Sequence, residues 1–410
     1  MDEKIKVTNK CPICGRLTHK ESKYCIFHAS AEEKTEEEFK QALKKYVNKI
    51  KKEDGEYDFK KFIFIGDIDF KKDLNITVFK NARFSEATFE GYAGFAGATF
   101  ERFPTFMKAT FKGNAGFSGA TIKGNADFSG ATIEDNADFS GATIKRYAIF
   151  SGATFEEDAF FVKATFKGDA DLELRYLAKS LIFYEVNVFP GKKCSINVNN
   201  EKGNISFKRA YLENTNLDIE LIKDVSIDFS GALLRNTKIE KDQIKNHILQ
   251  ENEKKFTEAK EIFLLLRNNF HSIGRYEDES WAFKKEKDME RKSYFHFKSL
   301  HKWLWSCLLN GLFGYGEQPV KVIASAIIII LIFTFLFMSS GISDTSIGGF
   351  TSKNFLDCVY FSIITFTTLG YGDFRPVEGC GRIFAGTEAF IGASMMALFV
   401  YTFARRTGGR

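Results

Sequence analysis

Four potential metal ligands lie close together near the start of the sequence. Cys11 and Cys14 are separated by two residues. Ten residues later, Cys25 and His28 repeat that spacing. Three thiolates and one imidazole can form a closed tetrahedral zinc site, whose effect is to fold a short segment that cannot bury a core of its own. His19, between the two pairs, is a poorer ligand. We therefore predict a structural zinc site, and the alternative is a set of free cytosolic thiols.

A second group of residues could bind a dehydrated cation. Residues 367–373 read Thr-Thr-Leu-Gly-Tyr-Gly-Asp, with Gly370 and Gly372 at alternate positions. Successive backbone carbonyls can face the same way only if alternate residues adopt left-handed dihedral angles, which glycine does at low cost. Stacked carbonyl oxygens can then replace the water shell of an ion, and the Thr368 hydroxyl would add oxygen at one end. The residues predicted to form this filter are Thr368, Leu369, Gly370, Tyr371 and Gly372, and those predicted to support it are Thr367, Asp373 and Glu388.

Two apolar segments and one short helix are predicted to position this run. Residues 322–338 contain no charged residue, and residues 383–403 contain one acid, Glu388. Each segment can cross a hydrocarbon core of about 30 Å. Lysine and arginine are dense before the first segment and after the second, which places both termini in the cytosol and residues 339–381 outside. Residues 354–366 have helical spacing and would form a re-entrant pore helix, whose C-terminal end favours a cation.

The run, its short helix and the two flanking spans resemble the potassium-channel signature over residues 320–405. The resemblance implies a pore that four subunits build together in a plasma membrane. The run departs from the commonest pattern at Leu369, where valine is more usual. The pore helix also has Ile364 at the position where some members of the family carry a glutamate behind the filter.

Two residues of the second span have roles that the sequence leaves open. Glu388 would replace the missing pore-helix glutamate, with Thr365 or Ser362 as its partner, because an ionisable group at membrane depth needs one. The alternative is an acid that meets a water-filled crevice. Gly392 lies ten residues after Arg382, where inner helices of this family commonly have a gating glycine. It is expected either to act as a gating hinge or to permit close helix packing.

The region between residues 78 and 172 is repetitive, with large apolar anchors at alternating gaps of six and five residues. A small residue, usually alanine, lies two positions before most anchors. Neither a helix nor a flat strand fits these gaps, whereas a coil that turns a corner at every step does. The pattern resembles the pentapeptide-repeat family, which implies a right-handed quadrilateral β-helix. Because every second step has six residues, each coil should take about 22 residues.

The remaining segments complete a multidomain chain. Weaker anchors extend the repeats towards residue 240, around an irregular insert predicted near residues 175–204. A charged stretch carries one apolar stripe, which consists of Phe39, Leu43, Val47 and Ile50. The predicted boundaries are a zinc-binding motif at 1–30, a charged helix at 31–58, the β-helix at 59–240, a helical hairpin at 241–297, an interfacial helix at 298–318, and an all-α, two-transmembrane pore domain at 319–410.

These features together predict a potassium-selective channel subunit that conducts passively through a homotetrameric pore. Neither span has regularly spaced arginines, so we expect no voltage sensor. Few residues follow Phe403, so an unidentified ligand or cytosolic partner would gate the pore through the N-terminal domain. We expect no cleaved signal peptide, because the N-terminus is charged. The alternative is a membrane-tethered repeat scaffold with a weakly selective cation pore.

Two further classes of function are not predicted. The sequence contains no nucleophile–base pairing and no phosphate-binding loop, so we expect no enzyme. Over residues 78–172 there are 10 Lys and Arg against 12 Asp and Glu. Because this balance produces no strong field, we expect no nucleic-acid partner.

Overall fold

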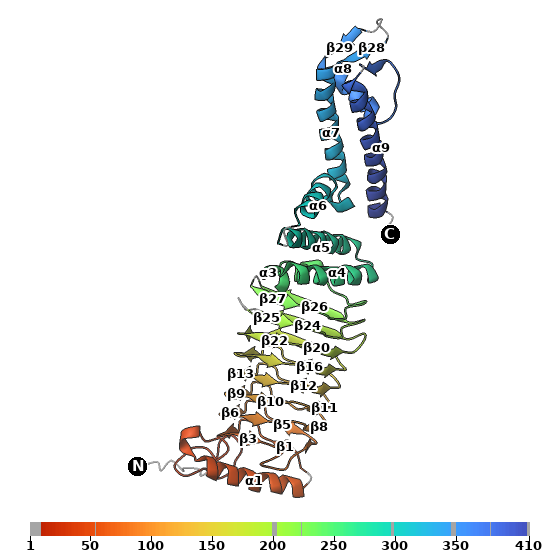
Figure 1. Ribbon diagram of the computed structural model, residues 1–410. Coiled ribbons are helices and arrows are strands. Elements are labelled where there is room, and N and C mark those ends of the chain that lie inside the picture. Colours follow the sequence, from red (N-terminus) through yellow and green to blue (C-terminus); the bar gives the residue numbers. More distant parts are fainter. Residues whose placement is uncertain are drawn as a thin grey trace, which may run out of the picture. The chain divides into compact units, whose positions relative to one another are not determined.

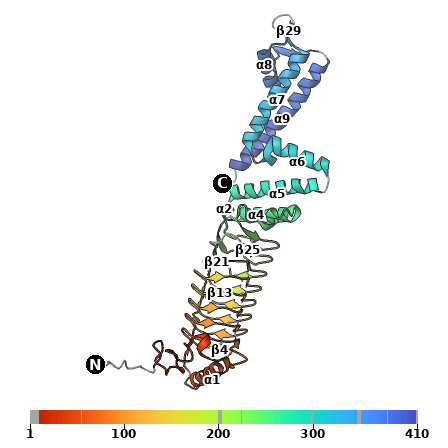
Figure 2. The same cartoon turned by 90° about the vertical axis from the view of Figure 1, so that its left-hand side faces the viewer.

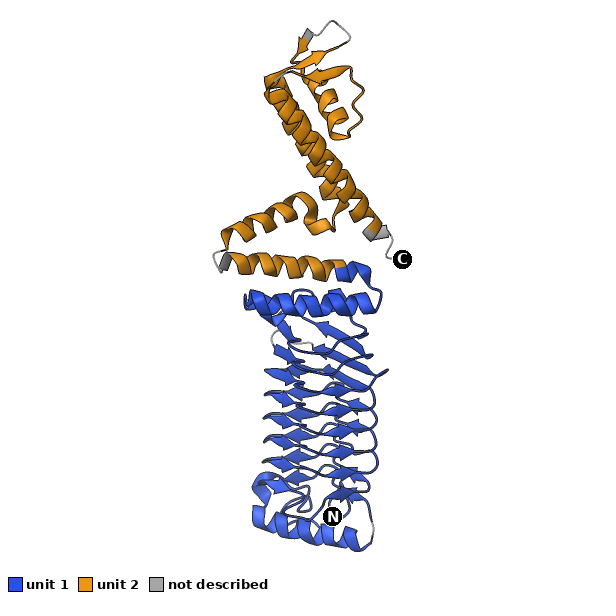
Figure 3. Cartoon of the chain, turned by 45° about the vertical axis from the view of Figure 1, so that its right-hand side comes forward, with its two compact units in different colours: residues 1–279 blue, residues 280–410 orange. Residues whose placement is uncertain are grey.

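The computed structural model describes residues 10–53, 55–198, 203–222, 224–296, 299–345, 350–377 and 379–407. The chain divides into two compact units, Met1–Glu279 and Ser280–Arg410 (Figure 3). The first unit is a β-solenoid with helices at both ends, and the second is mainly helical (Figure 1). The predicted fold class, a four-sided solenoid joined to a helical region with two long apolar helices, is confirmed.

The solenoid has four faces, each of which is a parallel sheet. Face 1 contains β1 (Tyr57–Asp58), β5 (Ala82–Arg83), β12 (Ala126–Asp127), β16 (Ala148–Ile149), β20 (Ala170–Leu174), β24 (Lys193–Val198) and β26 (Asn216–Leu221). Face 2 contains β2 (Ile63–Phe64), β6 (Thr88–Phe89), β9 (Thr110–Phe111), β13 (Thr132–Ile133), β17 (Thr154–Phe155) and β21 (Tyr176–Leu177). Face 3 contains β3 (Ile68–Asp69), β7 (Ala93–Gly94), β10 (Ala115–Gly116), β14 (Ala137–Asp138), β18 (Ala159–Phe160), β22 (Ser180–Ile182), β25 (Gly203–Ser206) and β27 (Val225–Asp228). Face 4 contains β4 (Val78–Phe79), β8 (Thr99–Phe100), β11 (Thr121–Ile122), β15 (Thr143–Ile144), β19 (Thr165–Phe166) and β23 (Asn187–Val188).

The register between coils confirms the predicted repeat length. Ala115 pairs with Ala137, and Thr121 pairs with Thr143, so equivalent positions recur at the expected interval. The chain visits the four faces in order, and each step between anchors turns one corner. Isolated bridges through Thr105 join β5 to β12, which makes face 1 continuous.

Stacked phenylalanines fill the interior of the solenoid. Phe95, Phe117 and Phe139 lie one above another, with ring centroids 4.8 and 4.9 Å apart, and each is at most 1% exposed. Phe106 and Phe128 form part of a second stack, with a spacing of 4.8 Å. The two stacks meet edge to face, since the rings of Phe106 and Phe117 are inclined at 87°. Offset and edge-to-face contacts are the favoured aromatic geometries, so the abundant phenylalanine is explained by the core.

The five-residue steps turn their corners through a residue in the left-handed conformation. Glycine occupies this position in many coils, for example Gly130 and Gly141, with φ of 64° and 66°. Lys108 and Lys163 occupy it elsewhere, with φ of 55° and 56°. A left-handed conformation costs a side chain about 1–2 kcal/mol, which favours glycine here. The six-residue steps turn instead through three consecutive corner residues, such as 134–136.

The segment predicted as an irregular insert, near residues 175–204, continues the solenoid. Strand β20 pairs with β24, and β24 pairs with β26, so the faces run on through wider coils. Ala170 aligns with Cys194 instead of residue 192, because this coil is longer. Phe183 continues one phenylalanine stack, 5.1 Å from Phe161, but leucine, isoleucine and valine fill most other core positions here, which hides the repeat in the sequence. Residues 199–202 of this segment lie outside the described residues.

A helix covers the N-terminal end of the solenoid. The 3-10 turn η1 spans Ala31–Glu33 and helix α1 spans Glu36–Lys52, inside the predicted range 31–58. The helix begins where it does because Thr35 and Glu38 form a reciprocal capping box. The predicted apolar stripe is confirmed and faces the solenoid, with the Phe39 ring 5.6 Å from that of Phe64.

Helices also cover the other end of the first unit. They are α2 (Lys241–Ile244), α3 (Leu249–Asn252) and α4 (Phe256–Ser272), followed by the start of α5 (Tyr276–His296). The buried Asn269 side chain accepts from the Thr237 N–H at 2.9 Å and donates to the Thr237 carbonyl at 2.8 Å. The Asn269 amide therefore makes the hydrogen bonds that a following strand would make to the last coil. The turn before α5 is held by Asp278, which lies 2.6 Å from Arg275.

The second unit contains a bundle of three apolar helices (Figure 2). Its elements after α5 are α6 (Leu300–Phe313), the 3-10 turn η2 (Gly314–Gly316), α7 (Pro319–Ser340), β28 (Ile342–Asp344), β29 (Phe350–Ser352), α8 (Phe355–Phe366), β30 (Phe374–Pro376) and α9 (Cys380–Thr407). By length and composition, α7 and α9 can each cross a membrane. The short helix α8 packs on α7 through Phe361, whose ring lies 4.8 Å from that of Phe337.

Removing one interior ring should loosen the solenoid locally. We expect Phe117→Ala to lower the free energy of unfolding of the adjacent coils by about 3–5 kcal/mol, because it leaves a cavity between stacked rings. Hydrogen–deuterium exchange of the full-length protein would measure this as faster amide exchange in those coils. Phe103→Ala is the matched control, since the Phe103 ring is 54% exposed and should cost less than about 1 kcal/mol. Equal effects of the two substitutions would contradict the stacked core.

Candidate functional site

The loop at residues 367–373 follows α8 directly and has the alternating backbone that the sequence predicted. Thr368, Gly370 and Gly372 have φ of 59°, 54° and 84°. The structure therefore places left-handed residues at every second position, with Leu369 and Tyr371 between them. The positive φ at Thr368 was not foreseen, because only glycine takes this conformation cheaply. Its hydroxyl donates to the Thr367 carbonyl at 2.7 Å.

The C-terminal end of α8 anchors the inner part of this loop. The N–H groups of Leu369 and Gly370 lie 2.9 and 3.3 Å from the Ile364 carbonyl, to which they donate. The Thr368 N–H donates to the Thr365 carbonyl at 3.0 Å. These bonds satisfy carbonyls that the helix end would otherwise leave open. They also fix where the loop starts relative to the negative end of the helix dipole.

A small antiparallel sheet anchors the outer part of the loop, so the prediction that residues 319–410 are all-α is wrong at this point. Strand β28 pairs with both β29 and β30, and β30 follows the loop directly. The Thr345 hydroxyl lies 2.9 Å from the Gly372 carbonyl and 2.7 Å from the Asp373 carbonyl. The Asp373 side chain accepts from the Phe374 N–H at 3.0 Å and also interacts with the Tyr360 hydroxyl of α8. Three-residue strands of mixed composition give no period that a sequence could reveal.

Glu388 lies behind the loop, buried between α8 and α9. Its carboxylate accepts a hydrogen bond from Ser362, one of the two partners proposed from the sequence. The Ser362 hydroxyl is also 3.0 Å from the Ile330 carbonyl, so this group joins all three helices. Glu388 is fully buried, and its second oxygen has no hydrogen-bond partner in the described part of the chain. Thr365, the other proposed partner, uses its carbonyl to hold the loop instead.

Gly392 lies where α9 passes closest to the end of α8. A Cβ atom added to this glycine would lie only 2.0 Å from the Phe366 carbonyl oxygen. Any side chain here would therefore push the two helices apart. Helix α9 runs without interruption through this position in the structure. The close packing of α8 and α9 therefore explains why this position is a glycine. A hinge at Gly392 stays a prediction.

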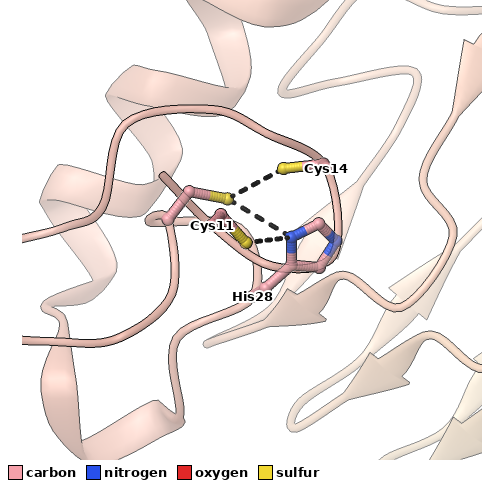
Figure 4. Close-up of side chains that lie close together, drawn as sticks. Cys11, Cys14 and His28 are labelled. Atoms are coloured by element: carbon pink, nitrogen blue, oxygen red, sulfur yellow. Dashed lines mark hydrogen bonds between the residues drawn. The ribbon is translucent and has the colours of Figure 1, made fainter. Parts of the chain in front are cut away.

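The four predicted metal ligands come together at the other end of the chain. The donor atoms of Cys11, Cys14, Cys25 and His28 all lie within 4.8 Å of one another. Figure 4 shows the side chains that it labels pointing towards a common centre. The Cys14 and Cys25 sulfurs are 3.5 Å apart, and the Cys25 sulfur is 3.3 Å from His28 Nδ1. Ligands of one tetrahedral zinc ion are separated by about 3.8 Å, so the donor set and its spacing fit this metal.

The surroundings of the cluster orient its ligands. His28 Nε2 lies 3.1 Å from the Lys60 carbonyl, which leaves Nδ1 to face the three sulfurs. Burial raises the pKa of the Cys11 thiol, but backbone hydrogen bonds, first from Cys25, outweigh burial and lower that pKa to about 6. Burial raises the pKa of the Cys25 thiol to about 12. A metal ion would hold both as thiolates, which is the form that binds zinc.

The cluster is also joined to the first coil of the solenoid. The Ile63 N–H donates to the Phe27 carbonyl at 2.8 Å, which extends the coil onto the segment that carries the four predicted ligands. The Phe27 ring stacks on that of Phe62, with centroids 4.6 Å apart. Lys34 donates to the carbonyls of Ile26 and Ile63 at 2.9 and 2.6 Å, and burial lowers its pKa to about 8. These contacts join residues that are far apart in the sequence, so the sequence pattern could not predict them.

Comparison with known proteins supports both parts of this description. Residues 314–408 match the ion-channel family, and overlapping matches across residues 77–173 identify pentapeptide repeats. The chain thus joins a segment that is similar to ion channels to a segment that is similar to pentapeptide repeats. The protein named "Two pore potassium channel a" from Oryza sativa subsp. japonica is 39% identical over 54 residues, which are 13% of this chain and 16% of that relative. The chain thus aligns with less than two thirds of the relative's length. No solved structure matches the chain.

Metal removal should destabilise the N-terminal end of the solenoid. We expect one zinc per chain in the purified protein, lost in Cys11→Ser, because three remaining ligands bind the ion weakly. Elemental analysis would measure the metal, and hydrogen–deuterium exchange would show faster exchange in α1 and in the coil at residues 57–64. Loss to a chelator should be faster at pH 5 than at pH 7.5, since protons compete for the thiolates. Cys194→Ser, at a buried cysteine of β24, should keep the zinc.

The contact between Glu388 and Ser362 should matter for the stability of the helical bundle. We expect Glu388→Ala to lower the midpoint of thermal unfolding in detergent, because it leaves a cavity and a buried hydroxyl without its partner. Glu388→Gln keeps the volume and an acceptor, so it should come close to the parent protein. Thr387→Ala, at the exposed neighbouring position, is the control. If Glu388→Ala and Thr387→Ala have the same midpoint of thermal unfolding, the contact between Glu388 and Ser362 does not stabilise the bundle.

Proposed function

We propose that this protein is one subunit of a potassium-selective channel in the plasma membrane, and that four copies form its pore. The observation that carries the proposal is the alternation of left-handed residues at Thr368, Gly370 and Gly372. This alternation lets backbone carbonyls face one direction, which a ring of four loops needs to replace the water around an ion. The match of residues 314–408 to ion channels supports a membrane protein without enzymatic function. The name of the rice relative favours potassium as the ion.

The exposure of the loop supports an assembly of several copies. Leu369 is 58% exposed and Tyr371 is 71% exposed in the single chain. Both are large side chains that would pack against neighbouring copies and hold the carbonyl rings at a fixed diameter. Large apolar side chains on α7 and α9, such as Phe335 and Phe390, are also exposed. Lipid and neighbouring subunits would cover them.

Each predicted site residue has a place in this proposal. Thr368 to Gly372 would line the ion path, with Thr367 and Asp373 fixing its two ends. Glu388 would support the loop from behind through Ser362. Gly392 would let α9 approach α8 and, on opening, would be the point where α9 bends. Both termini would lie in the cytosol, and α6, with exposed Leu304 and Trp305, would lie at the membrane surface.

The first unit would organise or gate the pore. Zinc would hold its N-terminal end closed, and α5 leads from the solenoid into the second unit. A ligand or cytosolic partner bound to the first unit would then bias the pore between its states. The alternative function is a membrane-tethered scaffold with a weakly selective cation pore. In that case the loop would pass other cations, such as sodium, as well as potassium.

Ion flux separates these two functions. We expect liposomes that contain the purified protein to pass potassium much faster than sodium, measured with an ion-sensitive dye under matched gradients. Equal rates would leave only the scaffold alternative. Gly370→Ala should abolish the flux, because a side chain at φ of 54° costs about 1–2 kcal/mol in each of four loops. Gly386→Ala is the matched control, since a Cβ atom there meets open space on a helix and the flux should persist.

A further inference from the structure

Most charged residues of the regular coils lie on two of the four corners of the solenoid. In the coils between residues 90 and 169, the corner after face 4 carries five basic residues against two acidic ones. We define Arg102, Lys123, Lys145, Arg146 and Lys167 as the basic column. The corner after face 2 carries six acidic residues against one basic residue. We define Glu90, Glu134, Asp135, Glu156, Glu157 and Asp158 as the acidic column.

The six-residue steps produce these columns. Both charged corners fall on the longer steps, which supply three consecutive corner residues in each coil. The corners after faces 1 and 3 fall on the shorter steps and are mostly Ser-Gly turns, for example at Ser129 and Ser140. Because the chain visits the faces in order, the two columns lie on diagonally opposite corners of a four-sided solenoid.

Much of this charge is not used within the chain. Lys145 and Arg146 are exposed and make no ion pair with any described residue. Glu134 and Glu156 on the opposite column are likewise exposed and unpaired in the described ranges. Other members of the columns do pair, for example Lys123 with Glu101 at 3.3 Å. Two exposed aromatic rings, Phe103 and Tyr147, lie on the basic corner, each 54% exposed.

Diagonal columns of opposite charge match the requirement of a fourfold ring. When four square columns stand side by side around an axis, each touches its neighbours through two adjacent faces. The corner between those faces points to the axis, and the two corners that flank it are diagonal to one another. If the two flanking corners of each subunit are called A and B, corner A of one subunit meets corner B of the next subunit at every contact. Such a head-to-tail contact needs two different, complementary surfaces, which the two columns provide.

We infer that the solenoids of four subunits pack side by side, with the basic column of one against the acidic column of the next. This inference rests on the tetramer of the proposed function. A corner made mostly of Ser-Gly turns then faces the axis, and Phe103 and Tyr147 are covered at the contact. Because rotation about the axis keeps the height, residues 134–136 of one subunit lie half a coil, about 2.4 Å along the solenoid, from residues 145–147 of its neighbour, which is close enough for contact. Complementary charge would set the order and register of the ring.

A disulfide across this contact tests the inference in the full-length protein. Asp135→Cys combined with Arg146→Cys should form inter-subunit disulfides under mild oxidation, seen as covalent oligomers on a non-reducing gel. Mass spectrometry would identify the peptide that joins positions 135 and 146. Asp135→Cys combined with Ser140→Cys is the matched control, and positions 135 and 140 should not join. Circular dichroism would confirm that each variant is folded.

Charge reversal provides the second arm of the experiment. In the Asp135→Cys/Arg146→Cys background, Lys145→Glu with Lys167→Glu should lower the yield of the disulfide at least fivefold. Adding Glu134→Lys and Glu156→Lys, which lie half a coil from the reversed positions, should restore it. A yield that reversal leaves unchanged would overturn the inference.

The molecular mass of the detergent-solubilised protein distinguishes the two proposals. A tetramer that lacks the 135–146 disulfide overturns the side-by-side packing and leaves the channel proposal standing. In that case the basic column would be free for a partner of another class, such as a polyanion. A protein that is not tetrameric overturns both proposals. A tetramer with the disulfide, lost and restored by the two reversals, supports the packing.

Discussion

A backbone that must be left-handed at every second residue is the constraint on which the second unit depends. Thr368, Gly370 and Gly372 adopt this conformation. Without it, the successive backbone carbonyls of the loop could not all face the same direction. A segment with this alternating backbone cannot form the hydrogen bonds of a β-sheet, so its conformation must be held by other parts of the structure. The surrounding structure supplies the restraint: the Ile364 carbonyl holds one end, and the Thr345 hydroxyl holds the other.

The parts that the sequence predicted are those in which local spacing alone decides the structure. The alternating five- and six-residue gaps define a coil, because inward positions recur whatever lies outside them. The glycines of the loop similarly report a backbone conformation directly. The parts that it missed depend on contacts between distant residues. Ser362 and Thr365 lie three residues apart and so share one face of helix α8, and spacing alone could not tell that Ser362 contacts Glu388. The insert expected near residues 175–204 was wrong because core packing tolerates leucine and isoleucine at positions where the repeat has phenylalanine.

The metal cluster shows the same division between local and distant information. The spacing of Cys11, Cys14, Cys25 and His28 was sufficient to predict that they converge. Their purpose in the fold became apparent only from the contacts with the first coil, through Phe27 and Lys60. A parallel solenoid leaves unpaired strand edges at both ends, where another chain could add. The ligand segment and α1 close one edge, and the Asn269 amide closes the last coil at the other. The cluster of four ligand residues and the Asn269 amide therefore lie at the two ends of the solenoid where strand edges would otherwise be open.

Charge is the property for which counting along the sequence was least informative. The repeats have nearly balanced charge, and a balanced count predicted no strong field. Position within the coil changes that conclusion, because residues 22 apart stack on one corner while residues 11 apart lie on opposite corners. Glu134 and Lys145 are 11 residues apart and cancel in a count, yet they lie on opposite sides of the solenoid. A pentapeptide solenoid with only five-residue steps would lack the longer corners that carry these side chains. The departure from the regular repeat is thus what separates the charges and makes opposite corners complementary.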